Sequence, residues 1–164
     1  MILIAFGSNL SSELFGNPIE NCIKAVEILK TKFKVEKISK FYKTEPIPKS
    51  SQSWFINGVV SITTDYTPIH VLEHLMQIEK SFKRIRGIKN DPRVIDLDLI
   101  SYNDIVLNSK DLVLPHPRMH ERKFVLMPIC DINDEWIHPV LKKKAKNLLK
   151  TLAKQKIFNI NVKY

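Results

Sequence analysis

Residues 91–100 read DPRVIDLDLI, and the second half of this stretch alternates apolar and acidic residues. A period of two is typical of a β-strand, in which residues i and i+2 point to the same face. One face of a strand over 94–101 therefore carries the apolar side chains, and the other carries Asp96 and Asp98. The two carboxylates lie about 7 Å apart along such a strand. The stretch predicts one face turned to a core and one acidic face turned to a ligand or to solvent.

Asp96 and Asp98 form a candidate Mg²⁺ site. Two carboxylates this close repel each other and raise each other's pKa unless a cation lies between them. Mg²⁺ takes hard oxygen ligands of this kind, together with water and substrate phosphates. Arg93 lies just before the pair, where its planar guanidinium group is suited to an anion. An Asp-x-Asp pattern also occurs on the solvated face of an edge strand, so the pattern alone leaves both interpretations open.

The chain up to residue 101 predicts the element order β-α-β-β-α-β. Asn17-Pro18 fits an N-cap followed by proline, and Thr67-Pro68 opens a second helix in the same way. Apolar spacing predicts helices over 18–32 and 68–85, and strands over 2–6, 33–42, 54–64 and 94–101. This is the order of the ferredoxin-like arrangement, an α+β fold with an antiparallel sheet and helices on one face.

The C-terminal third is expected to add helices over the other face of the sheet. Asn103 and Asp104 fit a hairpin turn into a strand at 105–107, whereas 115–121 is polar and interrupted by proline. Residues 124–132 predict a short apolar helix, and 141–154 an amphipathic helix with a lysine-rich face. Residues 1–164 would then form a single domain with α-β-α layers.

The composition favours a polyanionic ligand. The chain has 26 lysine and arginine residues against 17 aspartate and glutamate residues, a formal net charge of +9. Such a balance suits nucleic acid, nucleotides or acidic membranes. The four glycines permit neither a P-loop nor a dinucleotide-binding fingerprint, so a nucleotide would be held by side chains and metal. No apolar run is long enough for a membrane span, and Cys22 and Cys130 make no disulfide framework, so a reducing cytoplasm is expected.

Two further groups flank the acidic strand. Glu79 interrupts the apolar stripe of the second helix, where a carboxylate is disfavoured unless it is paired. A buried salt bridge and a ligand-facing role both remain open for it. A basic cluster follows, made of Lys80, Lys83, Arg84, Arg86, Lys89 and Arg93. Beside a Mg²⁺ site this cluster suits phosphoryl transfer, and without a metal it suits an RNA surface.

Aromatic and basic residues elsewhere fit the same kind of ligand. The segment 116–122, HPRMHER, is dense in groups that bind phosphate or ribose, and it lacks the spacing of a zinc site. Phe55 and Phe124 are suited to a core, or to stacking on a flat heterocycle. The lysines of 141–154 are expected to form a solvated helix face.

Two long motifs resemble a known family. They are PRVIDLDL at 92–99 and LPHPRMHERKFVLMP at 114–128. GSNL at 7–10, FYKTEP at 41–46 and FIN at 55–57 fit in the same order. The resemblance, which covers about residues 1–140, is to the 6-hydroxymethyl-7,8-dihydropterin pyrophosphokinases of folate biosynthesis.

The resemblance implies transfer of the β,γ-diphosphoryl unit of ATP to the hydroxymethyl group of the pterin, with release of AMP. The implied ligands of two Mg²⁺ ions are Asp96 and Asp98. The implied catalytic groups, which would contact the phosphates, are Arg84 and Arg93. The ATP side would be completed by Glu79, His116, Arg122 and the backbone near Leu99. Those residues would read the nucleotide, with the metal ions bridging its triphosphate.

The resemblance also implies a pterin site. The pterin would lie between Phe55 and Phe124, and its polar edge would be read by Asn57, Thr44 and the main chain near Ile47. ATP and 6-hydroxymethyl-7,8-dihydropterin would be the partners of a monomer, with no nucleic acid and no membrane. The alternative is a basic ferredoxin-like module that binds RNA, although two acids in the centre of such a surface would repel the RNA backbone unless they held metal.

Overall fold

The computed structural model describes residues 1–82, 93–152 and 155–162. The main sheet is antiparallel and has the strand order β5-β1-β4-β3-β8, with β2 also paired to β4. Its strands are β1 (Ile2–Ser8), β2 (Lys34–Ile38), β3 (Phe41–Thr44), β4 (Phe55–Thr63), β5 (Asp96–Tyr102) and β8 (Ile157–Ile160). Because β1 lies between β5 and β4, and β2 and β3 both pair with β4, the predicted ferredoxin-like arrangement is confirmed.

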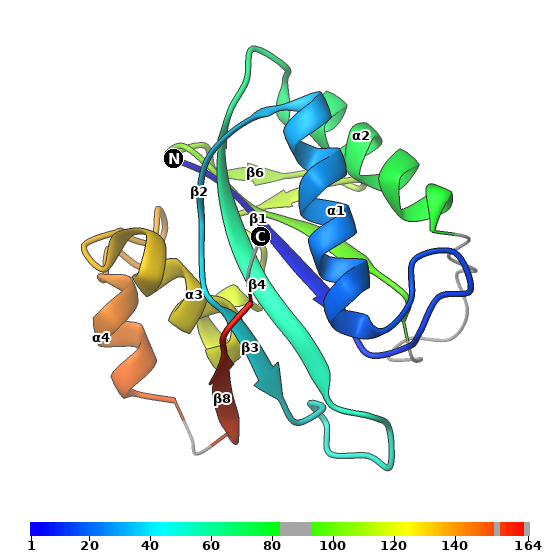
Figure 1. Cartoon of the computed structure of the whole chain (residues 1–164). Coiled ribbons are helices and arrows are strands. Elements are labelled where there is room, and N and C mark those ends of the chain that lie inside the picture. The colour runs from blue at the N-terminus through cyan, green and yellow to red at the C-terminus, as the bar shows by residue number, and fades with distance from the viewer. Residues whose placement is uncertain (83–92, 153–154, 163–164) are drawn as a thin grey trace.

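Two helices, α1 (Pro18–Lys32) and α2 (Pro68–Ser81), lie on one face of the sheet (Figure 1). Each has proline in its first turn after an N-cap whose side chain accepts backbone N–H groups. The Asn17 side chain accepts from Ile19 and Glu20, so α1 begins where the sequence predicts. The apolar faces of both helices enter a core that includes Ile4, Phe6, Leu29, Leu75, Leu97 and Leu99.

The other face of the sheet is covered by α3 (Lys123–Asn133) and α4 (Ala145–Lys150) (Figure 1). A second core lies beneath them, with Leu3, Val59, Ile100, Leu126 and Ile129 among its buried residues. Asp131 of α3 accepts a hydrogen bond from the Tyr42 hydroxyl at 2.8 Å, which ties the helix to β3. The predicted α-β-α layering is confirmed. No helix in the described ranges is long and apolar enough to cross a bilayer.

The single strand predicted over 33–42 is wrong, because the chain divides there into β2 and β3. At the break, Val59 N donates to Ser39 Oγ at 2.9 Å, and Lys40 N donates to Asp131 Oδ2 at 3.2 Å. These side-chain acceptors interrupt the regular pairing with β4. Before the break, β2 pairs with residues 60–63 of β4. After the break, β3 pairs with residues 55–57 of β4, which lie nearer the candidate site.

The turn predicted at Asn103 and Asp104 is present, because Ile105 N donates to Tyr102 O at 3.0 Å, but the predicted hairpin is not formed. Asn103 has φ of 50° and donates its N–H to Met1 O at 3.0 Å. The following strand, β6 (Leu107–Asn108), pairs with β7 (Val113–Leu114) instead of with β5.

The amphipathic helix predicted over 141–154 is wrong as well, because the described helix there covers only Ala145–Lys150. His138 Nδ1 accepts hydrogen bonds from Val140 N at 3.2 Å and Leu141 N at 3.1 Å, which closes a turn. Lys142 follows with φ of 54°, a left-handed conformation that an α-helix cannot include. Downstream, β8 is a strand that the sequence did not predict, and it pairs with β3.

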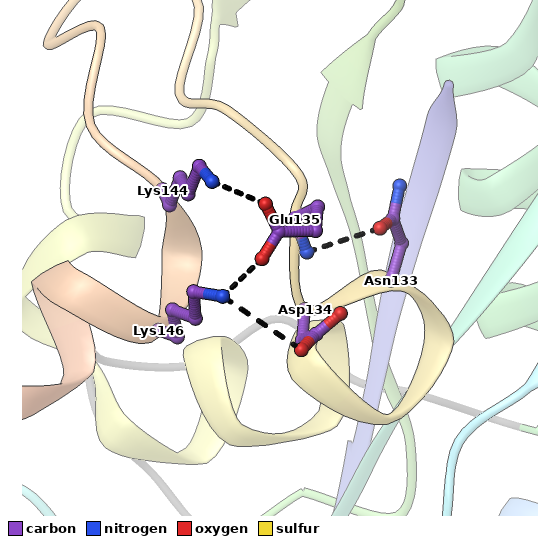
Figure 2. Close-up of polar contacts among 5 residues, drawn as sticks. All are labelled: Asn133, Asp134, Glu135, Lys144 and Lys146. Carbon is purple, nitrogen blue, oxygen red and sulfur yellow. Dashed lines mark hydrogen bonds and ion pairs between the residues drawn. The ribbon is translucent and has the colours of Figure 1, made fainter.

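An exposed ion-pair cluster holds the segment between the His138 turn and α4 against the end of α3 (Figure 2). Glu135 accepts hydrogen bonds from Lys144 and Lys146, and Lys146 Nζ lies 4.0 Å from Asp134 Oδ2. Asn133 Oδ1 accepts from Glu135 N at 3.1 Å. The bonds from the two lysines lower the pKa of Glu135 to about 2. Two lysines of the predicted solvated face therefore join α4 to α3, although salt will screen such exposed pairs.

The variant His138→Asn is expected to resist acid better than the natural protein. Burial, with a smaller contribution from His120, lowers the pKa of His138 from 6.5 to about 4. The unfolded chain therefore binds this proton at a higher pH than the folded protein does. The stabilisation is complete above pH 6.5 and is lost as the pH falls through about 4. Asparagine Oδ1 can accept the same two N–H groups without titrating.

Urea unfolding at neutral pH and near pH 4.5 measures this difference. The natural protein should lose about 2 kcal/mol more free energy of unfolding than the variant over that interval. Equal losses in the two proteins would show that His138 does not carry the acid sensitivity.

Candidate active site

The acidic pair of β5 lies on the face of the sheet that α3 covers. Asp96 and Asp98 are half-buried and alternate with Leu97 and Leu99, whose side chains are buried in the core beneath α1 and α2. Asp98 is in register with Ala5, which packs against the core beneath α3. The predicted strand with one apolar face and one acidic face is therefore confirmed. Its acidic residues lie next to the apolar core beneath α3.

Asn57 of β4 lies in the same row as Asp96, with Gly7 of β1 between them. Residues in register across an antiparallel sheet project to the same face. A Cβ on Gly7 would lie 2.7 Å from Asn57 Oδ1, so glycine is needed for the amide to lie this close to β1. The row places a predicted metal ligand and a predicted pterin-binding amide on one surface.

Each carboxylate has an arginine beside it. Arg93 Nη1 donates to Asp96 Oδ2 in a half-buried ion pair, and Arg122 Nη1 lies 3.9 Å from Asp98 Oδ2. The Arg122 guanidinium group also lies 5.5 Å from the centroid of the Phe124 ring, a cation–π distance. Burial, and then the nearby Arg118, lower the pKa of Arg122. An anion that enters this cluster meets two oriented guanidinium groups.

His116 stands next to this cluster as a neutral hydrogen-bond donor. Its backbone N–H donates to Ile100 O at 2.8 Å, and its ring Nδ1 accepts from Arg118 N at 3.2 Å. Burial, followed by the charges of Arg122 and Arg118, lowers the pKa of His116 to about 4. With Nδ1 occupied as an acceptor, the proton of the neutral ring is on Nε2.

A β-bulge in β5 explains how His116 reaches the strand. Ile4 is in register with Leu99 and Leu3 with Ser101, so Ile100 is an extra residue on β5. Bulges of this kind commonly re-aim groups next to functional sites. Here the bulge turns the Ile100 carbonyl to the outer edge of the sheet, where the segment that carries His116 binds it.

Glu79 caps the start of β5. Its side chain is buried, and Oε1 accepts a hydrogen bond from Leu97 N at 2.9 Å. This bond to the strand edge explains why an acidic residue interrupts the apolar stripe of α2. Glu79 is thus held one residue from each aspartate, and its contact with a nucleotide remains a prediction, as does that of the backbone near Leu99.

The predicted pterin residues lie at the other end of the row. Thr44 is buried, and its Oγ1 accepts from Asn57 Nδ2 at 2.7 Å. Phe55 is in register with Thr44, and Phe124 lies in the first turn of α3 beside Arg122. Both rings are half-buried. Ile47 is 54% exposed on the loop after β3, and Arg84 lies outside the described residues.

The sequence model described as 7,8-dihydro-6-hydroxymethylpterin-pyrophosphokinase (HPPK) matches residues 3–134. The chain belongs to this family. The match includes β5, the segment 116–122 and the start of α3, which together carry most of the candidate site. The resemblance found in the sequence motifs is therefore confirmed.

Relatives of similar length are found in bacteria. Enzymes named 2-amino-4-hydroxy-6-hydroxymethyldihydropteridine pyrophosphokinase are 32% identical in Aquifex aeolicus, over 88% of each chain, and 30% identical in Haemophilus influenzae, over 96% of each chain. Folic acid synthesis protein FOL1 of Dictyostelium discoideum is 36% identical over 141 residues, which are 86% of this chain and 21% of that protein. The chain spans about a fifth of the length of this relative and of two similar fungal proteins.

Solved structures share the HPPK fold. A Plasmodium falciparum HPPK-DHPS triple mutant superposes with a TM-score of 0.70 at 16% identity, over 91% of this chain and 43% of that one. The wild-type HPPK-DHPS gives a TM-score of 0.66 at 15% identity, over 91% and 44% of the two chains. The TM-scores show that the HPPK fold is shared, and at identities this low the likeness shows the fold alone.

The donor set on β5 fits Mg²⁺. Asp96 and Asp98 offer carboxylate oxygens from one face of a rigid strand, and Mg²⁺ is usually held by one or two carboxylates, water and substrate phosphates. Within the described ranges, no group of three or more histidine, cysteine, aspartate or glutamate side chains is gathered for a metal. Substrate and water oxygens would therefore complete the coordination in a member of the HPPK family.

Sequence reasoning did not identify Asn9 or Asp131, which support the site in this HPPK family member. Asp131 fixes α3 to β3 through Tyr42, and so holds the helix that begins beside Asp98. Asn9 contacts the backbone of Arg93. The motif GSNL at 7–10 contains Asn9 and could have pointed to this residue. The motif does not reveal the hydrogen-bond partners of Asn9, because they are distant in sequence.

Proposed function

We propose that this chain transfers the β,γ-diphosphoryl group of ATP to the hydroxymethyl group of 6-hydroxymethyl-7,8-dihydropterin, in folate biosynthesis. The observation that carries the proposal is the row Asp96–Gly7–Asn57, because it sets carboxylates suited to Mg-ATP beside a buried amide suited to a polar heterocycle. The hydroxymethyl oxygen forms a bond to the β-phosphorus, and the bond from that phosphorus to the AMP oxygen breaks. The hydroxyl proton is released.

Asp96 and Asp98 would hold two Mg²⁺ ions, which neutralise triphosphate charge when bound. Arg93 and Arg122, now beside these carboxylates, would turn to phosphate oxygens. Once it has turned to the bound phosphates, a guanidinium group stabilises the negative charge that develops on them. Arg84 would add another guanidinium group from the segment between α2 and Arg93.

Other residues of the ATP side act as donors and acceptors. His116 is neutral near pH 7 and would donate from Nε2 to a phosphate or ribose oxygen. Glu79 and the backbone near Leu99 would bind the nucleoside along the edge of β5. The bond between Glu79 and Leu97 N supports this placement, since it holds the carboxylate at that edge.

On the pterin side, Asn57 and Thr44 would read the polar edge of the ring. Their mutual hydrogen bond fixes the orientation of the Asn57 amide before the substrate binds. Phe55 and Phe124 would contact the faces of the pterin, and the main chain near Ile47 would complete the site. Aromatic contacts of this kind add about 1 kcal/mol beyond area burial.

Replacing Gly7 with alanine is expected to weaken pterin binding about tenfold. The added methyl carbon would lie 2.7 Å from Asn57 Oδ1, and the hydrogen bond to Thr44 holds that amide in place. The amide must therefore move, at a cost of about one hydrogen bond. Calorimetric titration with the pterin measures the loss, and nucleotide binding by the same variant serves as the control. Pterin affinity equal to that of the natural protein would contradict the role given to Gly7.

The product formed from ATP tests the proposed reaction. Purified protein with ATP, Mg²⁺ and 6-hydroxymethyl-7,8-dihydropterin should form AMP, and it should form none when the pterin or Mg²⁺ is omitted. Formation of ADP, or of AMP without the pterin, would contradict the proposal. The comparisons give the alternative RNA-binding module no support, and weak salt dependence of any RNA affinity would count further against it.

We further propose that the chain acts as a monomer in the cytoplasm. Both cysteines are free thiols, which supports a reducing compartment. Light scattering of the purified protein tests the oligomeric state, and a dimer mass would contradict it.

A further inference from the structure

Asn9, directly after β1, is buried and binds two segments of the candidate site at once. Asn9 N donates to Arg93 O at 3.0 Å, and Arg93 N donates to Asn9 Oδ1 at 2.7 Å. Asn9 Nδ2 donates to Gln52 Oε1 at 3.1 Å and to Ser53 O at 3.2 Å. One residue thus pairs with both backbone groups of Arg93 and with the end of the loop before β4.

The backbone around Asn9 is itself held in place. Leu10 N makes a second bond to Arg93 O at 3.1 Å. From α1, the buried Asn21 donates to Leu10 O at 3.0 Å and lies 3.4 Å from Ser8 Oγ. Asn9 is therefore attached to a helix and a central strand, which makes it a firm anchor for the two segments that it binds.

Those two segments lead to opposite sides of the proposed reaction. Arg93 forms the ion pair with Asp96, on the ATP side. Ser53 is followed in β4 by Phe55 and Asn57, on the pterin side. A displacement of either segment would strain the hydrogen bonds that hold the other, because both sets of bonds use the same amide group.

We propose that Asn9 is a positioning residue that couples the two substrate sites. This inference rests on the proposed function. Binding of nucleotide at Arg93 would favour the conformation of 52–53 that suits the pterin, and binding of pterin would favour the matching position of Arg93. Such coupling is reciprocal, so each ligand must raise the affinity of the other by the same factor.

A binding cycle tests the role of Asn9. Pterin affinity is measured by calorimetry with and without a non-hydrolysable ATP analogue and Mg²⁺, for the natural protein and for Asn9→Ala. We expect the nucleotide to tighten pterin binding about tenfold or more in the natural protein. In Asn9→Ala the factor should fall to about two, with each separate affinity changed less than the coupling factor.

Asn133→Ala is the matched control, because Asn133 also holds a backbone N–H group but at the far end of α3 (Figure 2). It should keep the full coupling factor. If Asn9→Ala does not fold, Gln52→Ala decides the question, since it removes one acceptor of Asn9 Nδ2 and should lower the factor about threefold.

Full coupling in Asn9→Ala or in Gln52→Ala, or no coupling in the natural protein, would overturn the role of Asn9. These results are distinct from failure of the proposed function. If the natural protein forms no AMP from ATP and the pterin, the reaction itself is wrong, whereas AMP formation with unchanged coupling in the variants removes only the role of Asn9.

Discussion

Replacing Asp98 with asparagine is expected to lower kcat/KM for AMP formation about 1000-fold. Asparagine has the size of aspartate but lacks the charge that would hold Mg²⁺ and balance Arg122, whose Nη1 lies 3.9 Å away. The fold should survive, because the Asp98 side chain is 38% exposed and neither apolar core uses it. A change of only a few degrees in Tm is therefore expected.

Asp96→Asn should give a loss of similar size, and Asp104→Asn is the control. Asp104 is an exposed carboxylate just beyond the other end of β5, so its replacement removes the same charge away from the site. The measurement is the initial rate of AMP release at saturating Mg²⁺. Near-natural turnover in both Asp96→Asn and Asp98→Asn would exclude the proposed metal role of the pair.

Replacing Asn57 with alanine should lower kcat/KM for the pterin about 100-fold while nucleotide affinity stays within about twofold. The change removes a buried amide and leaves the hydroxyl of Thr44, now 2.7 Å from Asn57 Nδ2, without this partner. A site built to hydrogen-bond a substrate loses much of its affinity when such a group is missing. The loss should appear mainly in the KM for the pterin.

Thr44→Val gives a second measurement of the same site. It removes the acceptor that orients Asn57, and we expect a loss of about tenfold, smaller than that of Asn57→Ala. Ser61→Ala, a buried polar residue further along β4, is the control for general effects on the strand. Equal losses of pterin and nucleotide affinity in Asn57→Ala would show a general distortion in place of a pterin-specific role.

Much of the fold follows from local patterns in the sequence. Two proline-marked N-caps and a helical spacing of apolar residues are sufficient to place α1 and the start of α2. The alternation at 95–99 places β5 and separates its acidic face from its apolar face. These features need only contacts within a helix turn or a strand, which is why the sequence reveals them.

The errors lie where distant contacts outweigh local preference. The lysine-rich pattern at 141–154 is helical by spacing, but the turn around His138 and the ion pairs of Glu135 limit the helix to Ala145–Lys150. Likewise β8 is a strand because β3 offers an edge to pair with. Propensity is a weak prior when tertiary contacts of this kind compete with it.

Local patterns in the sequence are sufficient to identify the chemical groups of the site, which are two carboxylates on one strand face with arginines near them. How these groups meet depends on contacts between distant parts of the chain. The row Asp96–Gly7–Asn57 and the bonds from Asn9 to Arg93 and Ser53 join residues on separate strands and loops. Register across a sheet is set by the packing of a whole face against its helices, so no local pattern contains it.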